Sequence, residues 1–65
     1  MNEAIKIWLT ELYKKEIEEV RGTISNERLW EKGYNGNEPY NPHTDNIQTL
    51  MEYLKILEEK LEDVK

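Results

Sequence analysis

The 65-residue sequence contains no cysteine, which excludes disulfide bonds and thiolate metal sites and fits a reducing compartment. It also lacks any run that approaches the roughly 20 apolar residues of a membrane-spanning helix. The opening residues, MNEAIKIW, have neither the basic start nor the apolar core of a signal peptide. We therefore predict a cytoplasmic protein.

Basic residues are scarce, with 9 against 14 acidic residues and a net charge of −5. General binding to nucleic acid or to an anionic membrane surface needs a basic footprint, so we predict neither. The single histidine, His43, and the single serine, Ser25, are far apart in sequence, and nothing marks a nucleophilic triad. No glutamate precedes His43 by three residues, as in metal sites of helical bundles. We therefore predict a protein without enzyme activity, cofactor or metal.

Glycine and proline are nearly confined to the stretch from Arg28 to Thr44, which holds both prolines and two of the three glycines. Apolar residues on either side of it recur every three or four positions, which predicts a helix over about 2–32 and another over about 42–64. Asn2 and Asn41 are the expected N-caps, and the missing N–H of Pro42 suits a first helical position. The chain is thus predicted to be one all-α domain, 1–65, folded as an antiparallel two-helix hairpin with a bend over 33–41.

Apolar residues in the second helix follow steps of 3, 4, 3, 4 and 3, which is the seam of a coiled coil. This seam consists of Ile47, Leu50, Leu54, Leu57, Leu61 and Val64.

Two glycines make specific structural predictions. Gly22 costs roughly 0.5–1 kcal/mol inside a helix, so two alternatives stand: a continuous helix packed closely against another helix at Gly22, or a break there. Continuity is favoured because Val20 and Ile24 keep helical spacing through the site. Gly33 is predicted to end the first helix in a left-handed conformation.

The two helices are unequal, with lengths of about 45 Å and 33 Å at 1.5 Å per residue. The second helix therefore cannot cover the start of the first, and so small a core usually needs oligomerisation. We predict that the hairpin assembles into a homo-oligomeric helical bundle. The expected interface residues are Ile5, Trp8, Leu9, Leu12, Met51 and Ile56.

Both arginines of the chain lie on one polar stripe of the first helix, next to the bend. Arginine favours bidentate contact with phosphate, a helix N-terminus attracts anions, and tyrosine can stack on a base. The predicted ligand-binding residues are Arg21, Ser25, Arg28, Lys32, Tyr34, Tyr40, His43 and Thr44. The alternative is that the arginines pair with Glu18, Glu27 or Glu31 while the aromatic residues pack the bend.

The segment ISNERLWEKG (24–33), the Asn/Gly/Pro bend and the segment HTDNIQTLMEYLKILEEKL (43–61) carry a family resemblance. They are similar to small helical-hairpin proteins of phages and mobile elements of Gram-positive bacteria. They resemble more loosely the hairpin of phage anti-CBASS cyclic-dinucleotide sponges and anti-Thoeris cyclic-ADP-ribose sponges. The resemblance implies a non-enzymatic anti-defence protein in the host cytoplasm. It also implies a homo-oligomer that sequesters a cyclic nucleotide or cyclic ADP-ribose between its protomers. The alternative function is a protein-binding inhibitor or adaptor without a small-molecule ligand.

Overall fold

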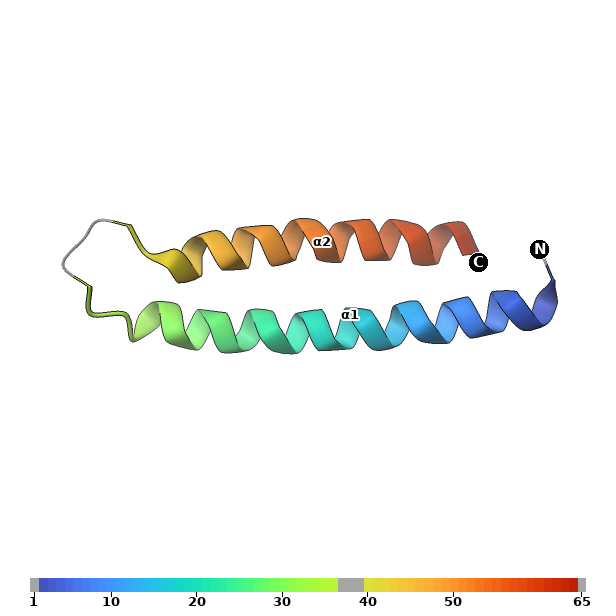
Figure 1. Cartoon of the computed structure of the whole chain (residues 1–65), viewed down its shortest axis with the longest axis horizontal. Helices are drawn as coiled ribbons and strands as arrows, with labels where there is room; N and C mark the ends of the chain where they lie inside the picture. The colour runs from blue at the N-terminus through green and yellow to red at the C-terminus, as the bar shows by residue number, and fades with distance from the viewer. Residues whose placement is uncertain (1, 37–39, 65) are drawn as a thin grey trace.

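The computed structural model describes residues 2–36 and 40–64, which form two α-helices and no strand. Helix α1 spans Glu3–Lys32 and helix α2 spans Pro42–Val64. The helices lie side by side in opposite directions, joined by the bend at one end (Figure 1). The hairpin is long and thin, 54 × 14 × 10 Å. The predicted all-α two-helix fold is confirmed, and its assembly into a larger bundle stays a prediction.

Asparagine caps start both helices, as expected from the sequence. The side-chain oxygen of Asn2 accepts the Ala4 N–H at 2.8 Å, and that of Asn41 accepts the His43 N–H at 3.0 Å. Each bond satisfies a backbone donor that the first turn of a helix leaves without a partner. Asn41 also donates from Nδ2 to the carbonyl oxygen of Glu31 at 3.1 Å. This side chain therefore caps α2 and at the same time holds it to the last turn of α1.

The prediction of a left-handed Gly33 is wrong. Gly33 has φ −89° and ψ 2°, and no residue in the described ranges has a positive φ. The Gly33 N–H still bonds the carbonyl oxygen of Leu29 at 3.2 Å, and the Tyr34 N–H bonds that of Glu31 at 3.4 Å. These bonds give hydrogen-bond donors to two carbonyl groups in the last turn of α1, which is tightened there. The backbone therefore does not need the left-handed conformation. A Cβ at position 33 would meet only ordinary contacts, the nearest at 3.7 Å.

Helix α1 passes through Gly22 without a break, so the continuous alternative holds. The sequence predicts that another helix packs closely against Gly22. Within the hairpin no helix does so, because a Cβ built at Gly22 has no described atom within 4 Å. The position lies on the exposed side of α1. Gly22 is thus a weak point of the helix without a compensating close contact in the hairpin.

Replacing Gly22 by alanine should therefore stabilise the hairpin. Alanine favours the helical state by roughly 0.5–1 kcal/mol over glycine. In a domain of this size that gain raises the melting temperature by roughly 2–8 °C. Thermal denaturation followed by circular dichroism tests this. A lower melting temperature for Gly22→Ala would show that a second chain approaches α1 at this point.

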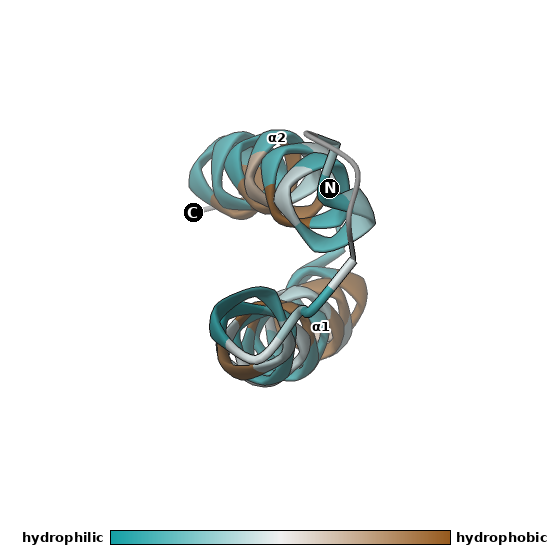
Figure 2. Cartoon of the chain, turned by 90° about the vertical axis from the view of Figure 1, so that its left-hand side faces the viewer, coloured by the Kyte–Doolittle hydropathy of each residue, from teal (hydrophilic) through white to brown (hydrophobic). Residues whose placement is uncertain are grey.

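The core lies along the line where the two helices meet. Ile17, Val20 and Ile24 from α1 and Leu57 from α2 form a buried cluster, which partly buried seam residues of α2 extend. Figure 2 shows hydrophobic segments on the side of α2 that faces α1, and further hydrophobic segments on the outer side of α1. None of the described side chains is completely shielded from solvent. Two helices alone leave a thin core, because each covers only one side of the other.

Candidate functional site

Two glutamates of α1 bind the beginning of α2. Glu27 Oε2 lies 2.7 Å from His43 Nδ1 and 3.3 Å from Asn46 Nδ2. Glu31 Oε2 accepts the Thr44 hydroxyl at 2.6 Å. Glu27 and His43 are mostly shielded, with 12% and 26% of their side chains exposed. Two residues predicted to bind a ligand, His43 and Thr44, therefore already have carboxylate partners that hold the helices together.

The aromatic residues near the bend pack mainly around His43. The rings of Trp30 and Tyr34 lie 5.9 Å and 6.0 Å from the His43 ring, centroid to centroid, with Tyr34 edge-on. The Tyr40 hydroxyl donates to Asp45 Oδ2 at 2.6 Å, and this bond raises the pKa of Tyr40. Trp30 and Tyr34 thus contact His43 as the packing alternative expects, whereas the observed partner of Tyr40 is Asp45. Trp30 is nevertheless 54% exposed, so much of its ring remains accessible.

The basic stripe of α1 divides into paired and unpaired residues. Arg21 lies 3.5 Å from Glu58 of α2, with both side chains at least half exposed, and such a surface pair contributes little stability. Arg28 and Lys32 make no ion pair or side-chain hydrogen bond with any residue in the described part of the chain. Glu27 and Glu31, expected as partners of the arginines, bind α2 instead. Among the described residues, Arg28 is thus a cation with no carboxylate within ion-pair distance.

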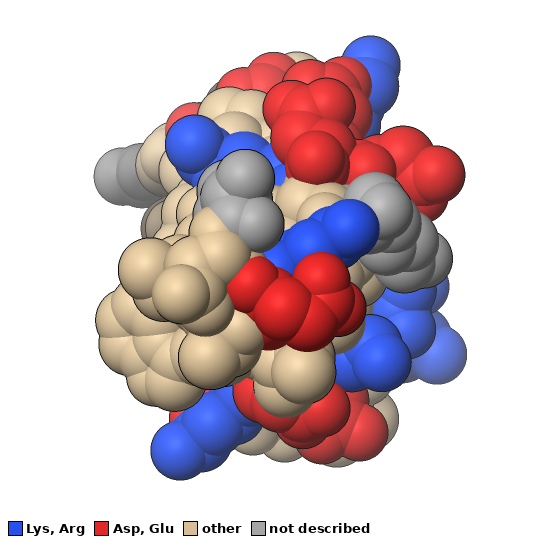
Figure 3. Space-filling model, turned by 90° about the vertical axis from the view of Figure 1, so that its right-hand side faces the viewer, with Lys and Arg blue, Asp and Glu red and all other residues tan. Residues whose placement is uncertain are grey.

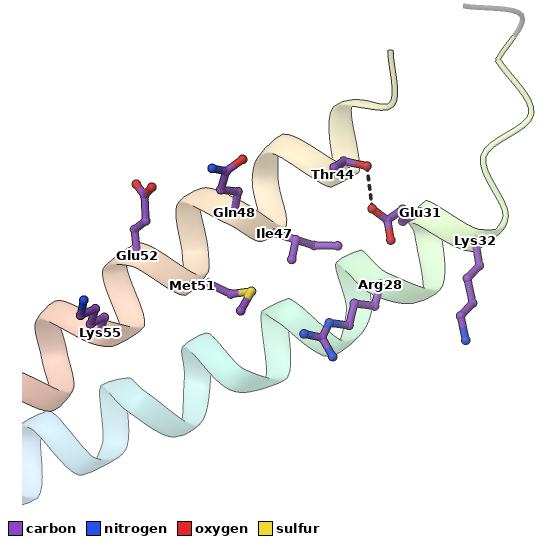
Figure 4. A pocket seen from close by; sticks show the side chains of 9 residues that line it. All are labelled: Arg28, Glu31, Lys32, Thr44, Ile47, Gln48, Met51, Glu52 and Lys55. Atoms are coloured by element: carbon purple, nitrogen blue, oxygen red, sulfur yellow. Dashed lines mark hydrogen bonds between the residues drawn. The ribbon is translucent and has the colours of Figure 1, made fainter. Parts of the chain in front are cut away.

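Arg28 lines an open groove of about 690 Å³ between the two helices. Ile47 and Met51 point from α2 towards α1 and form an apolar floor, while Lys32 points away from α2 (Figure 4). The hydrogen bond between Thr44 and Glu31 closes the end nearest the bend. The lining residues are Arg28, Glu31, Lys32, Thr44, Ile47, Gln48, Met51, Glu52 and Lys55. Three of them are basic and two acidic, so the groove has a small excess of positive charge in an acidic chain. We call it the Arg28 groove.

The structure does not bring the eight predicted ligand residues into one site. Arg28, Lys32 and Thr44 line the Arg28 groove, whereas Arg21 lies in a smaller groove of about 470 Å³ beside Glu58. Ser25 lines neither of these two grooves. The other predicted residues pack at or near the bend; these are Tyr34, Tyr40 and His43.

Of the α2 residues that line the Arg28 groove, the sequence predicted only Thr44 as a ligand-binding residue. Gln48 and Lys55 line it, together with Met51, which was predicted as an interface residue. A usable signal was present, because Thr44, Gln48, Met51 and Lys55 follow one another at steps of 4, 3 and 4. Such steps place residues on one face of a helix. Without the pairing of the helices, however, nothing indicated that this face lies beside Arg28.

The predicted interface residues fall into separate areas. Ile5, Trp8 and Leu12 are exposed in the N-terminal part of α1, and Leu9 is half-buried. The N-terminal end of α1 extends beyond the end of α2 (Figure 1). Figure 3 views this end and shows a continuous area of uncharged residues beside mixed acidic and basic groups. Met51 lies in the Arg28 groove, and Ile56 is exposed elsewhere on α2.

Other kinds of site find no support in the described residues. Within residues 2–36 and 40–64, no group of three or more histidine, aspartate or glutamate side chains could hold a metal ion. Neither α1 nor α2, over its described length, combines the length and apolarity needed to cross a membrane. Comparison with protein-family models, curated proteins and solved structures finds no match to this chain.

Proposed function

We propose that this protein is a non-enzymatic binding protein that sequesters a small signalling nucleotide in the Arg28 groove. The observation that carries the proposal is the position of Arg28, which lines a groove with an apolar floor and has no acidic partner among the described residues. A free guanidinium suits bidentate contact with phosphate. The groove volume, about 690 Å³, lies within the range of roughly 300–1,000 Å³ typical of small-molecule sites.

Each part of a nucleotide has a chemically matched region of the groove. The phosphate is expected on Arg28, with Lys55 and a reoriented Lys32 adding positive charge. The base is expected over Ile47 and Met51, since the polarisable sulfur of methionine suits contact with aromatic rings. Gln48 can both donate and accept hydrogen bonds at the edge of a base. This assignment keeps Arg28 and Lys32 of the residues predicted from sequence and adds four from α2, namely Ile47, Gln48, Met51 and Lys55.

The nucleotide class and the biological setting come from the family resemblance. Similarity to phage sponges supports a cyclic dinucleotide or a cyclic ADP-ribose as the ligand. It also supports an anti-defence role in the cytoplasm of a bacterial host, carried out by a homo-oligomer. Binding without cleavage suffices for such a role, because a captured signal no longer reaches its receptor.

Calorimetric titration with a panel of cyclic dinucleotides and cyclic ADP-ribose isomers tests the proposal. Arg28→Ala should weaken binding by roughly 10- to 150-fold, since one charge-assisted contact to phosphate contributes about 1.5–3 kcal/mol. Arg28→Lys should recover only part of the affinity, because lysine lacks the planar fork. Added salt should weaken binding by screening the charges.

Arg21→Ala is the matched control for Arg28→Ala. Arg21 lies on the same helix and is exposed, but it faces Glu58 outside the Arg28 groove. Its removal should leave nucleotide affinity unchanged. Absence of heat with every nucleotide would exclude sequestration of those ligands, and equal losses for the two arginine variants would exclude the Arg28 groove as the site.

A protein-binding inhibitor or adaptor is the second candidate function. The observation that favours it is the exposed apolar surface beside the bend, where Leu29, Trp30 and Tyr34 remain accessible. Tryptophan and tyrosine are enriched among the residues that dominate protein interfaces. The pairing of His43 and Thr44 with glutamates also fits this function, since it removes those residues from a ligand site. If this second function is correct, calorimetric titration of the wild-type protein should give no heat with any nucleotide.

A further inference from the structure

The hairpin exposes more surface than a compact protein of its mass. A folded protein of 7.8 kDa exposes roughly 4,400 Å², whereas this chain exposes 5214 Å². The excess of roughly 800 Å² equals the area that each partner contributes to an interface of standard size. The radius of gyration, 15.6 Å, likewise exceeds the roughly 11 Å expected for a compact chain of this length. One interface of ordinary size would bring the exposed area to the usual value.

The N-terminal part of α1 carries a continuous apolar face suited to such an interface. Ile5, Trp8, Leu9 and Leu12 follow one another at steps of 3, 1 and 3, which places them on one side of the helix. Trp8 is 62% exposed, and Ile5 and Leu12 are each about half exposed. We call these four residues the N-terminal apolar face.

The spacing of this face reads the same in both directions along the helix. Steps of 3, 1 and 3 are symmetric about the point between Trp8 and Leu9. When a second copy lies antiparallel with its two-fold axis at that point, Ile5 faces Leu12 and Trp8 faces Leu9 of the other copy. Every contact is then apolar against apolar. Such self-complementarity is what a two-fold symmetric interface requires.

Charge selects the antiparallel arrangement over the parallel one. Continuing the same face by helical steps from Leu12 leads to Glu16 and Glu19. In a parallel pair each glutamate would face its own counterpart, and like charges at such positions repel. In the antiparallel pair each glutamate lies roughly 20 Å or more along the axis from its own counterpart, so this repulsion is absent. Glu16 can then keep its bond from the Tyr53 hydroxyl, 3.3 Å long.

We propose that two copies of this chain pair antiparallel through the N-terminal apolar face, with a two-fold axis between Trp8 and Leu9. The inference specifies the interface of the homo-oligomer named under the proposed function and rests on that self-association. It does not rest on nucleotide binding, because Arg28 lies about 24 Å along α1 from Leu12. The dimer leaves the Arg28 groove open.

Sedimentation equilibrium of the full chain across a concentration series tests the pairing. Wild type should dimerise at micromolar concentration. Trp8→Glu should raise the dissociation constant roughly 30-fold or more, because a buried tryptophan at an interface centre commonly dominates its energy. Ile7→Glu is the matched control, since Ile7 is 58% exposed on the other side of α1, and it should dimerise like wild type. A monomeric wild type, or equal effects of the two variants, would overturn the proposal.

Cross-linking through introduced cysteines tests the direction of the pair, and the cysteine-free sequence makes it unambiguous. An antiparallel dimer predicts that Ile5→Cys and Leu12→Cys form a mixed disulfide when combined. Each variant alone should form none, because equivalent residues are about 10 Å apart along the axis, beyond the reach of a disulfide. Disulfides within single-variant samples would overturn the antiparallel direction. Neither sedimentation nor cross-linking uses a nucleotide. A result that contradicts the dimer therefore does not contradict nucleotide sequestration.

Discussion

Replacing Leu57 by alanine is expected to unfold most of the hairpin and to remove most of its helical circular dichroism signal. Leu57 is 5% exposed and packs against the buried α1 residues Ile17, Val20 and Ile24. Removing a buried leucine side chain typically costs about 2–5 kcal/mol. A single core in so short a chain rarely supplies more than roughly 3–5 kcal/mol. The loss is therefore comparable to the whole stability of the fold.

The adjacent residue provides a matched control for this prediction. Ile56 is 48% exposed, so Ile56→Ala should change the free energy of unfolding by about 0.5 kcal/mol or less. Urea denaturation of wild type and both variants at one protein concentration measures the difference. Equal losses for Leu57→Ala and Ile56→Ala would mean that α2 meets α1 through another face.

Asn41→Ala should lower the melting temperature by roughly 8–16 °C. The substitution removes the cap of α2, which typically contributes about 1 kcal/mol. It also removes the Nδ2 bond to the Glu31 carbonyl, which contributes about another 1 kcal/mol. In a domain of this size each kcal/mol corresponds to roughly 4–8 °C. Thermal denaturation at a single protein concentration is the appropriate measurement, because self-association makes the melting temperature depend on concentration.

One further variant separates the two contributions of Asn41, and a second variant serves as a control. Asn41→Ser keeps a cap acceptor for the His43 N–H but cannot span to Glu31, so it should recover about half of the loss. Asn35→Ala is the control, because Asn35 is exposed and makes no side-chain hydrogen bond with the described residues. It should melt like wild type. A melting temperature for Asn41→Ala equal to that of wild type would show that the bend does not depend on this residue.

Local patterns were sufficient to predict the helices and the side on which they meet. The heptad-like seam of α2 faces α1, as its steps of 3 and 4 indicate. Asn2 and Asn41 cap the helices through a backbone N–H only two residues further along the chain. This local bond does not depend on the rest of the fold. Gly33 shows where local reasoning fails. Several backbone geometries satisfy a helix end, and the residue type alone does not choose between them.

The candidate site could be predicted only in part. The basic stripe placed Arg28 and Lys32 together, because four residues along a helix is one turn. Whether each cation has an acidic partner depends on the opposite helix. Glu58 of α2 pairs with Arg21. The two glutamates nearest Arg28 in sequence, Glu27 and Glu31, bond to His43 and Thr44 of α2 instead. These partners are more than ten residues away in sequence, and periodicity carries no information about them.

The sequence by itself determined the elements: two amphipathic helices of unequal length, their caps, and an apolar face on α1 that a shorter α2 cannot cover. Those features depend on residues within a few positions of one another. The tertiary structure decided the register between the helices, and through it the pairing of Arg21 with Glu58, the unpaired state of Arg28 among the described residues, and the groove over Met51. The physical reason is that register is set by how side chains of both helices fit together, and this fit belongs to neither helix alone.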